Sequence, residues 1–166
     1  MKVKYKPSLI SKIGFKKEYN INDSNIKEID YYELILRLEK QENFHLAIGG
    51  SWCPNCLAFY PALDKFAKIE NLEVLSFDPR IGYRHKRKTD IRACKTKVQE
   101  LHMQELTKLL NLDLPIRVNN TYQMRVPLYF NIKNGRVVGS WSKEYFPHQM
   151  NEALTNEIIK ELKELE

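Results

Sequence analysis

The sequence has no apolar run long enough to cross a membrane. Its first residues, MKVKYKPSLISKIGFKK, are basic but contain no continuous apolar segment, so a secretory signal is not expected. Internal repeats and low-complexity linkers are also missing. Hydrophobic residues make up 43% and charged residues 29% of the 166 positions, which is typical of a globular chain. We therefore expect one domain, 1–166, that is cytoplasmic, monomeric and without a membrane partner.

Cysteine is scarce, and two of the three cysteines, Cys53 and Cys56, stand in the segment GGSWCPNCL. Disulfide staples are rare in reducing compartments, so a C-x-x-C pair there indicates redox or metal chemistry. A zinc site needs further ligands at a suitable spacing, and neither Cys94 nor His102 forms a recognisable second half. We favour a redox couple with no metal and no cofactor beyond the two cysteines, and we treat Cys94 as a bystander thiol.

Positive charge is concentrated in two segments. Residues 80–97 hold eight Lys or Arg against Asp90, a net charge of +7, and residues 1–20 sum to +5, so the rest of the chain sums to −6. The run RHKRK at 84–88 could neutralise phosphates. No aromatic residues are interleaved with it to stack on bases, so we favour a solvated loop over a nucleic-acid site. An acidic protein partner is the other candidate for 80–97.

Hydrophobic periodicity predicts an α/β fold. The expected helices are 31–42, a helix from Cys53 to about Ile69, 90–111 and 148–165, and the expected strands are 45–49, 72–77, 126–132 and 136–141. Asp30 and Glu33 form a capping-box pattern, and Asn134-Gly135 is a strong hairpin signal. Strands joined by a helix should be parallel, so the sheet should be mixed, with helices on both faces.

Local geometry would make the two cysteines unequal. Cys53 is expected at the cap of its helix, with Pro54 at the first helical position. The N–H groups of the first turn and the helix dipole favour negative charge there, and the thiolate is the nucleophile of disulfide exchange. Cys56 lies one turn further in. The pattern predicts that Cys53 attacks and that Cys56 resolves the mixed disulfide.

The segment WCPNC at 52–56 resembles the W-C-x-x-C motif of the thioredoxin superfamily. Pro61 matches the proline inside that family's active-site helix, Val126-Pro127 stands where the family has its cis-proline, and the turn at 133–135 looks like the family's hairpin. The resemblance covers roughly 26–80 and 120–165. It implies that Cys53 and Cys56 are the catalytic pair. It also implies that Trp52, Val126 and Pro127 contact the substrate. Pro54, Asn55 and Pro61 would belong to the active-site helix.

The resemblance implies a three-layer α/β/α domain with a mixed central sheet, an N-terminal extension over 1–25 and a helical insertion over 80–119. It also implies a thiol–disulfide oxidoreductase that acts on protein thiols and disulfides. The chain departs from the family pattern at Ala47, where the family has a buried aspartate, and at Leu128, after the expected cis-proline. Some likeness extends to thioredoxin-like accessory proteins of bacteriocin operons. The alternative is therefore a binding module that acts through its basic insertion without turnover.

Overall fold

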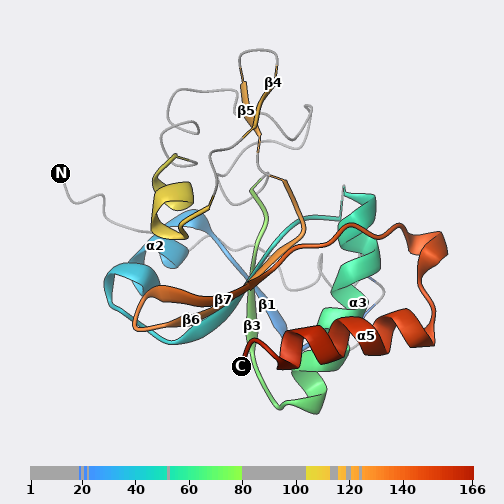
Figure 1. The fold of residues 1–166 in the computed structure, drawn as a ribbon. Helices are drawn as coiled ribbons and strands as arrows, with labels where there is room; N and C mark the ends of the chain where they lie inside the picture. Colours follow the sequence, from blue (N-terminus) through green and yellow to red (C-terminus); the bar gives the residue numbers. More distant parts are fainter. Residues whose placement is uncertain are drawn as a thin grey trace.

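The structure is a computed structural model, and it describes residues 19, 21, 23–51, 53–79, 104–112, 116–118, 121–123 and 125–166. Figure 1 shows the arrangement of its elements. These are β1 (Ile26–Ile29), α2 (Tyr31–Glu39), β2 (Phe44–Ile48), α3 (Pro54–Ile69), β3 (Val74–Phe77), β4 (Ile116–Val118), β5 (Thr121–Gln123), β6 (Leu128–Lys133), β7 (Arg136–Trp141), the 3₁₀ turn η1 (Pro147–Gln149) and α5 (Glu152–Lys163).

A five-stranded mixed sheet organises the molecule, with the strand order β1-β3-β2-β6-β7. The three strands β1, β3 and β2 are parallel, β6 runs antiparallel to β2, and β7 runs antiparallel to β6. In this strand order, the connection from β1 to β2 crosses the sheet in one direction, and the connection from β2 to β3 crosses it in the opposite direction. Right-handed crossovers therefore place α2 and α3 on opposite faces, and Figure 1 shows α3 and α5 together on one side and α2 on the other.

The elements on either side of the cysteines, β2 and α3, lie within one residue of their predicted bounds, whereas α2 ends at Glu39, three residues before the predicted end of 31–42. The central strands β2 and β3 are buried almost throughout, as expected for parallel strands that helices cover on both faces. The Asp30 side chain accepts a hydrogen bond from the Glu33 N–H at 2.9 Å, which confirms the predicted cap of α2. Asn134 and Gly135 have φ values of 52° and 70° between β6 and β7, so the predicted hairpin is confirmed.

Strand β1 was not predicted, because its sequence, IKEI, is short and half polar. It pairs with β3 along its whole length. The entry to β1 is anchored to α3 by the buried Asp64, whose Oδ1 accepts hydrogen bonds from Ser24 Oγ and Asn25 N, both at 2.9 Å. Long-range pairing and this polar anchor therefore create the strand, and neither has a local sequence signal.

The expected insertion is not purely helical. Residues 104–109 are helical, within the predicted 90–111. β4 and β5 form an antiparallel hairpin that was not predicted and that continues past the expected boundary at 119. The last helix is also shorter than predicted, because η1 occupies its first turn and Asn151 caps α5. The basic segment 80–97, Cys94 and residues 1–18 lie outside the described residues.

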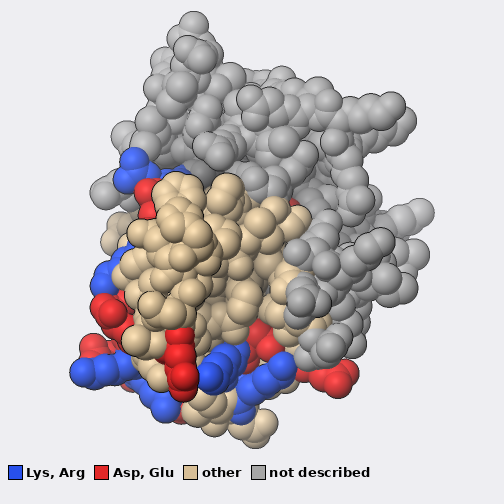
Figure 2. All heavy atoms as spheres, turned by 90° about the vertical axis from the view of Figure 1, so that its right-hand side faces the viewer, with Lys and Arg blue, Asp and Glu red and all other residues tan. Residues whose placement is uncertain are grey.

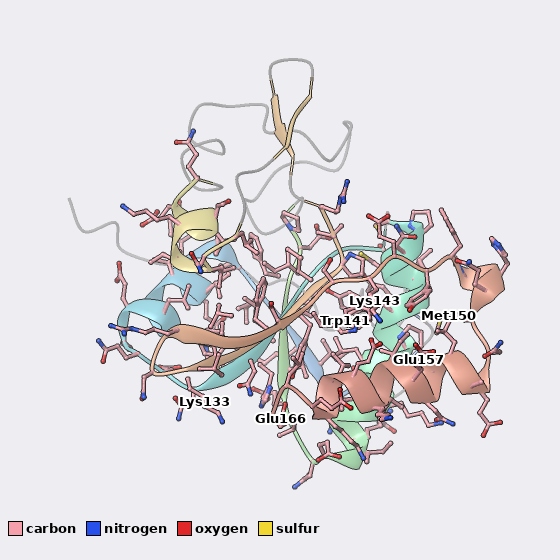
Figure 3. All side chains as sticks on the ribbon, in the orientation of Figure 1. Lys133, Trp141, Lys143, Met150, Glu157 and Glu166 are labelled. Atoms are coloured by element: carbon pink, nitrogen blue, oxygen red, sulfur yellow. The ribbon has the colours of Figure 1, made fainter. Side chains whose placement is uncertain are left out.

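Helix α5 is tied to the end of β7 by side-chain contacts. Trp141 Nε1 donates to Glu161 Oε2 at 2.6 Å, and Lys143 forms an ion pair with the same carboxylate. Figure 3 shows Trp141 and Lys143 lying over α5 near Glu157. Within the described ranges, no helix is both long enough and apolar enough to cross a membrane.

Candidate functional site

The candidate site lies where β2 runs into α3. After Ile48 the chain turns, and two backbone hydrogen bonds hold the turn: Gly49 N–H donates to Phe77 O at 3.1 Å, and Cys53 N–H donates to Gly50 O at 3.0 Å. The first bond continues the pairing of β2 with β3. The turn therefore presents Cys53 directly above the carboxyl end of the parallel strands, an edge where many α/β proteins place their sites.

Helix α3 begins at Pro54 with Cys53 as its N-cap residue, as the sequence predicts. Cys53 has extended dihedrals, φ −101° and ψ 119°, and Pro54 follows at the first helical position. The Cys53 carbonyl accepts hydrogen bonds from Cys56 N at 3.0 Å and Leu57 N at 3.1 Å. The Cys53 side chain itself makes no capping hydrogen bond. Its sulfur is directed elsewhere, so the expected contact with first-turn N–H groups is not seen.

The Cys53 sulfur instead faces the strand-entry segment before β6. Cys53 Sγ lies 3.9 Å from Val126 O, in the geometry of a thiol that donates to a carbonyl. The Val126–Pro127 peptide bond is cis, which is the form expected from the sequence. Segments more than seventy residues apart are thereby brought together at the cysteines.

Both cysteines are buried, and Cys56 is a weaker acid than an ordinary thiol. Cys53 is 4% exposed and Cys56 is 0% exposed, and no disulfide joins the two. A side-chain hydrogen bond with Cys53, together with burial, raises the pKa of Cys56 far above that of an ordinary thiol. Cys56 therefore keeps its proton, which it can share with the Cys53 sulfur.

Below the cysteines lies a buried polar pair that sequence reasoning missed. Tyr60 Oη and Ser76 Oγ are 2.7 Å apart, and both side chains are buried. Ser76 on β3 pairs with Ala47 on β2, so the polar pair lies between α3 and the centre of the sheet. The only local hint was Tyr60 on the same face of α3 as Cys56, since residues four apart share a helix face.

Most of the predicted site residues lie together around the start of α3, and the others lie elsewhere or outside the described residues. Cys53, Cys56, Val126 and Pro127 come together, with Pro54 and Asn55 in the first turn of α3. Pro61 lies further along α3, which continues through it to Ile69. Asn55 Oδ1 is buried and accepts no hydrogen bond from the residues that the structure describes. Trp52 lies outside the described residues.

A largely apolar groove, which Lys65 and Thr155 also line, lies beside the first turns of α3. It has a volume of about 300 Å³ between α3 and η1, and its apolar walls are Leu57, Ala58, Pro61, Ala62, Pro147 and Met150. This is the side of the molecule that Figure 2 turns toward the viewer, where uncharged side chains form a broad area and charged ones gather along its lower edge.

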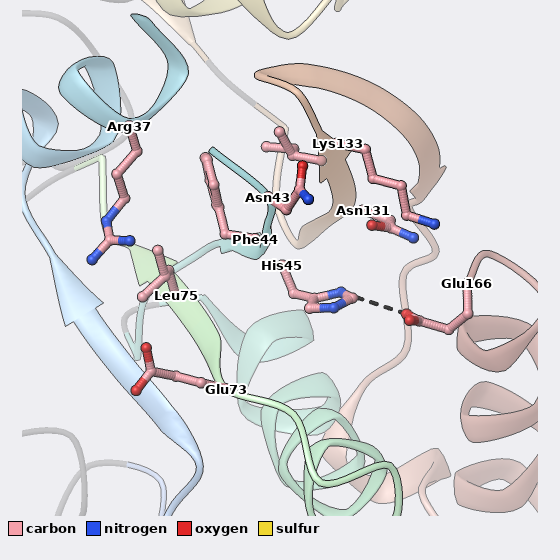
Figure 4. Close-up of a pocket in the computed structure, with 10 residues that line it drawn as sticks. Arg37, Asn43, Phe44, His45, Glu73, Leu75, Asn131, Lys133 and Glu166 are labelled. Carbon is pink, nitrogen blue, oxygen red and sulfur yellow. Dashed lines mark ion pairs between the residues drawn. The ribbon is translucent and has the colours of Figure 1, made fainter. Parts of the chain in front are cut away.

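A second, polar pocket of about 240 Å³ lies at the opposite end of β2. His45 Nδ1 lies 2.8 Å from Tyr129 Oη and 3.4 Å from Glu166 Oε1, and Figure 4 shows the His45–Glu166 ion pair at the pocket wall. Burial lowers the pKa of His45, and Glu166 partly offsets this. In the part of the chain that the structure describes, no group of three or more His, Cys, Asp or Glu side chains could hold a metal ion.

Comparison with known proteins adds little to this geometry. No family model matches the chain, and no curated protein matches it. Among solved structures, it is similar to a protein of unknown function from Pseudomonas aeruginosa, with 14% sequence identity and a TM-score of 0.39 over 81% of this chain and 75% of that chain.

Proposed function

We propose that this protein is a thiol–disulfide oxidoreductase that exchanges disulfides with protein substrates through Cys53 and Cys56. The observation that carries the proposal is the inequality of the two sulfurs. Cys53 stands at the cap of α3 and Cys56 one turn inside it, and the pKa of Cys56 is raised by its hydrogen bond to Cys53 and by burial. Cys56 thus keeps its proton until the second step, and Cys53, at the helix cap, is left to make the first attack.

The chemistry proceeds in two exchanges. The Cys53 thiolate attacks one sulfur of a substrate disulfide, the substrate S–S bond breaks, and the second substrate sulfur leaves as a thiolate. Cys56 then attacks the Cys53 sulfur of the mixed disulfide. The Cys53–Cys56 bond forms, the bond to the substrate breaks, and the proton of Cys56 goes to the departing substrate sulfur. The substrate gains two electrons and one proton from Cys56, its first thiolate takes a second proton from water, and the protein becomes the disulfide.

The architecture is compatible with a thioredoxin-like domain. A mixed sheet with helices on both faces and the cis Val126–Pro127 bond beside Cys53 are features that the sequence resemblance implies. We also propose the cytoplasm as its location, where thiols are kept reduced.

Equilibration with glutathione redox buffers tests the proposal. Alkylation of the quenched samples, followed by mass spectrometry, should show one cooperative two-electron transition between the dithiol and the Cys53–Cys56 disulfide. Cys53→Ser and Cys56→Ser should each abolish it, whereas Cys94→Ser should leave it in place. A chain that remains a dithiol over the whole accessible buffer range, or that forms only glutathione adducts, would contradict the proposal.

The burial of Cys53 favours a second candidate, a binding or accessory module without turnover. Because the whole Cys53 residue is only 4% exposed, it offers little area to a bulky protein disulfide. Such a module would keep its partner after loss of both cysteines, whereas the oxidoreductase would not turn over. A pull-down that compares the wild type with Cys53→Ser/Cys56→Ser therefore separates the two. Equal partner recovery and no redox transition would select the module.

A further inference from the structure

Gly49 brings a buried tyrosine hydroxyl close to the Cys56 sulfur. A methyl group added at Gly49 would lie 2.7 Å from Cys56 Sγ, 3.0 Å from Tyr60 Cε2 and 3.2 Å from Tyr60 Oη. The position of this added methyl group is thus within 3.2 Å of both Cys56 Sγ and Tyr60 Oη. The sulfur and the hydroxyl oxygen are therefore at most about 6 Å apart. Across that distance in a dry interior, a hydroxyl dipole interacts strongly with a sulfur that becomes charged.

The Tyr60 hydroxyl can change the direction in which it donates. It lies 2.7 Å from Ser76 Oγ, and either oxygen can be the donor, because each hydroxyl both donates and accepts. Burial, and next the charge on Cys56, raise the pKa of Tyr60 well above its ordinary value. The hydroxyl therefore keeps its proton. When Ser76 donates to Tyr60, the Tyr60 proton becomes available to the cysteine side.

The chemistry at Cys56 needs such a donor. Its sulfur must carry negative charge as it attacks the mixed disulfide, yet it is fully buried. The acidic groups that act on this region oppose that charge: Asp78 raises the pKa of both Cys56 and Tyr60, and Glu28 raises that of Tyr60. The Gly50 backbone N–H, which is hydrogen-bonded to Cys56, acts in the opposite direction. A hydroxyl proton turned toward the sulfur would act in the same direction as this N–H.

We infer that Tyr60 is a positioning residue for the second exchange, in which it turns its hydroxyl proton from Ser76 toward Cys56 as the Cys56 sulfur attacks. The inference rests on the proposed function. No proton is lost from Tyr60 in this step: the Cys56 proton leaves with the substrate sulfur, the Cys53–Cys56 bond forms, and the Tyr60–Ser76 pair then returns to its first direction.

Reaction with the aromatic disulfide 5,5′-dithiobis(2-nitrobenzoate) separates the two steps in one stopped-flow trace. Attack by Cys53 releases a first thionitrobenzoate, and attack by Cys56 on the mixed disulfide releases a second. Cys94 is replaced by serine in every sample, so that only the described cysteines react. We expect Tyr60→Phe to leave the first phase unchanged and to slow the second by about tenfold at neutral pH, the size typical of a lost hydrogen bond to a charged group. The rate of the second phase in Tyr60→Phe should also need a higher pH to reach its maximum than in the wild type.

Two further variants serve as controls for a general structural effect of Tyr60→Phe on the rates of the two phases. Ser76→Ala keeps the tyrosine hydroxyl but removes the partner that lets it turn, so it should slow the second phase by a smaller factor. Tyr129→Phe removes another buried hydroxyl, one that bonds His45 at the far end of β2, and should change neither phase. Equal second phases in Tyr60→Phe and wild type, or slowing of both phases together, would overturn the inference.

The same trace keeps the two proposals apart. If the wild type releases only one thionitrobenzoate, as Cys56→Ser should, then no couple forms and the proposed function fails. If the wild type releases two and Tyr60→Phe is indistinguishable from it, then the couple is present and only the role of Tyr60 is wrong. If circular dichroism shows that Tyr60→Phe is unfolded, the Ser76→Ala variant tests the inference instead. A second phase as fast as in the wild type would then contradict the proposed turning of the Tyr60 proton from Ser76 toward Cys56.

Discussion

At the scale of the residue, Gly49 is the position on which the cysteine geometry depends most directly. The close approach of Cys56 and Tyr60 leaves no room for a Cβ there. Glycine is used here for that missing atom and not for its backbone freedom, because Gly49 is not among the residues with positive φ.

Gly49→Ala is therefore expected to destabilise the fold by about 1–3 kcal/mol, the range for overpacking a buried site. Urea unfolding would measure the loss. In a Cys56→Ala background the new methyl group no longer meets a sulfur 2.7 Å away, so the cost should be smaller, although the contact with the Tyr60 ring remains. Equal costs in both backgrounds would mean that Cys56 is not what restricts Gly49.

Sequence reasoning works at this scale only for short-range features. Cys53 at a helix cap followed by Pro54 is visible in a few neighbouring residues, and the structure places both as expected. The approach of Ser76 to Tyr60 and the burial of Cys53 depend on how β3 and β6 pack around α3. Residues sixteen and more apart along the chain meet there, and no local pattern encodes such a meeting.

At the scale of the element, helix starts follow local rules most clearly. The Asn151 side chain accepts a hydrogen bond from Leu154 N at 2.8 Å, and its carbonyl accepts from Thr155 N at 2.9 Å, so α5 begins at Glu152. The apolar stripe predicted over 148–165 could not show that start, because Pro147–Gln149 forms a separate turn first. The strand β1 was missed for the opposite reason, since its pairing with β3 is entirely non-local.

Asn151→Ala should lower the free energy of unfolding by about 1 kcal/mol, the usual loss when an N-cap acceptor is removed. The residue is exposed, so burial contributes little to the effect. Asn151→Asp keeps an acceptor and adds a negative charge at the helix start, and should retain most of the stability. Thermal or urea unfolding of the three proteins decides. An alanine variant as stable as wild type would show that the cap does not limit the stability of α5.

At the scale of the whole molecule, the chain's last residue is joined to the second strand. His45 on β2, Tyr129 on β6 and Glu166 after α5 form one partly buried polar cluster. Burial lowers the pKa of His45 from its ordinary value of 6.5; Glu166 raises it, and Lys133 lowers it further. The unfolded chain therefore takes up a proton before the folded one as the pH falls.

The stability that the neutral His45 contributes should accordingly be fully present above about pH 6.5. It should be lost progressively as the pH falls below that value. Chemical unfolding at a series of pH values would show the fall, and His45→Gln should flatten it. Glu166→Gln removes the charge that favours protonated His45, so the acid loss should become larger than in wild type. An acid loss that is identical in wild type and His45→Gln would assign it to other groups.

The stacking of Trp141 on Phe59 has an optical consequence. The two rings lie 4.6 Å apart and nearly parallel, at 16°, and Phe59 is three residues beyond Cys56 on the same helix. Indole emission is sensitive to its immediate surroundings, and the only other tryptophan is Trp52. With Trp52 replaced by phenylalanine, the remaining fluorescence comes from a ring in contact with the helix that carries both cysteines, so the protein contains its own label for following that helix without an added dye.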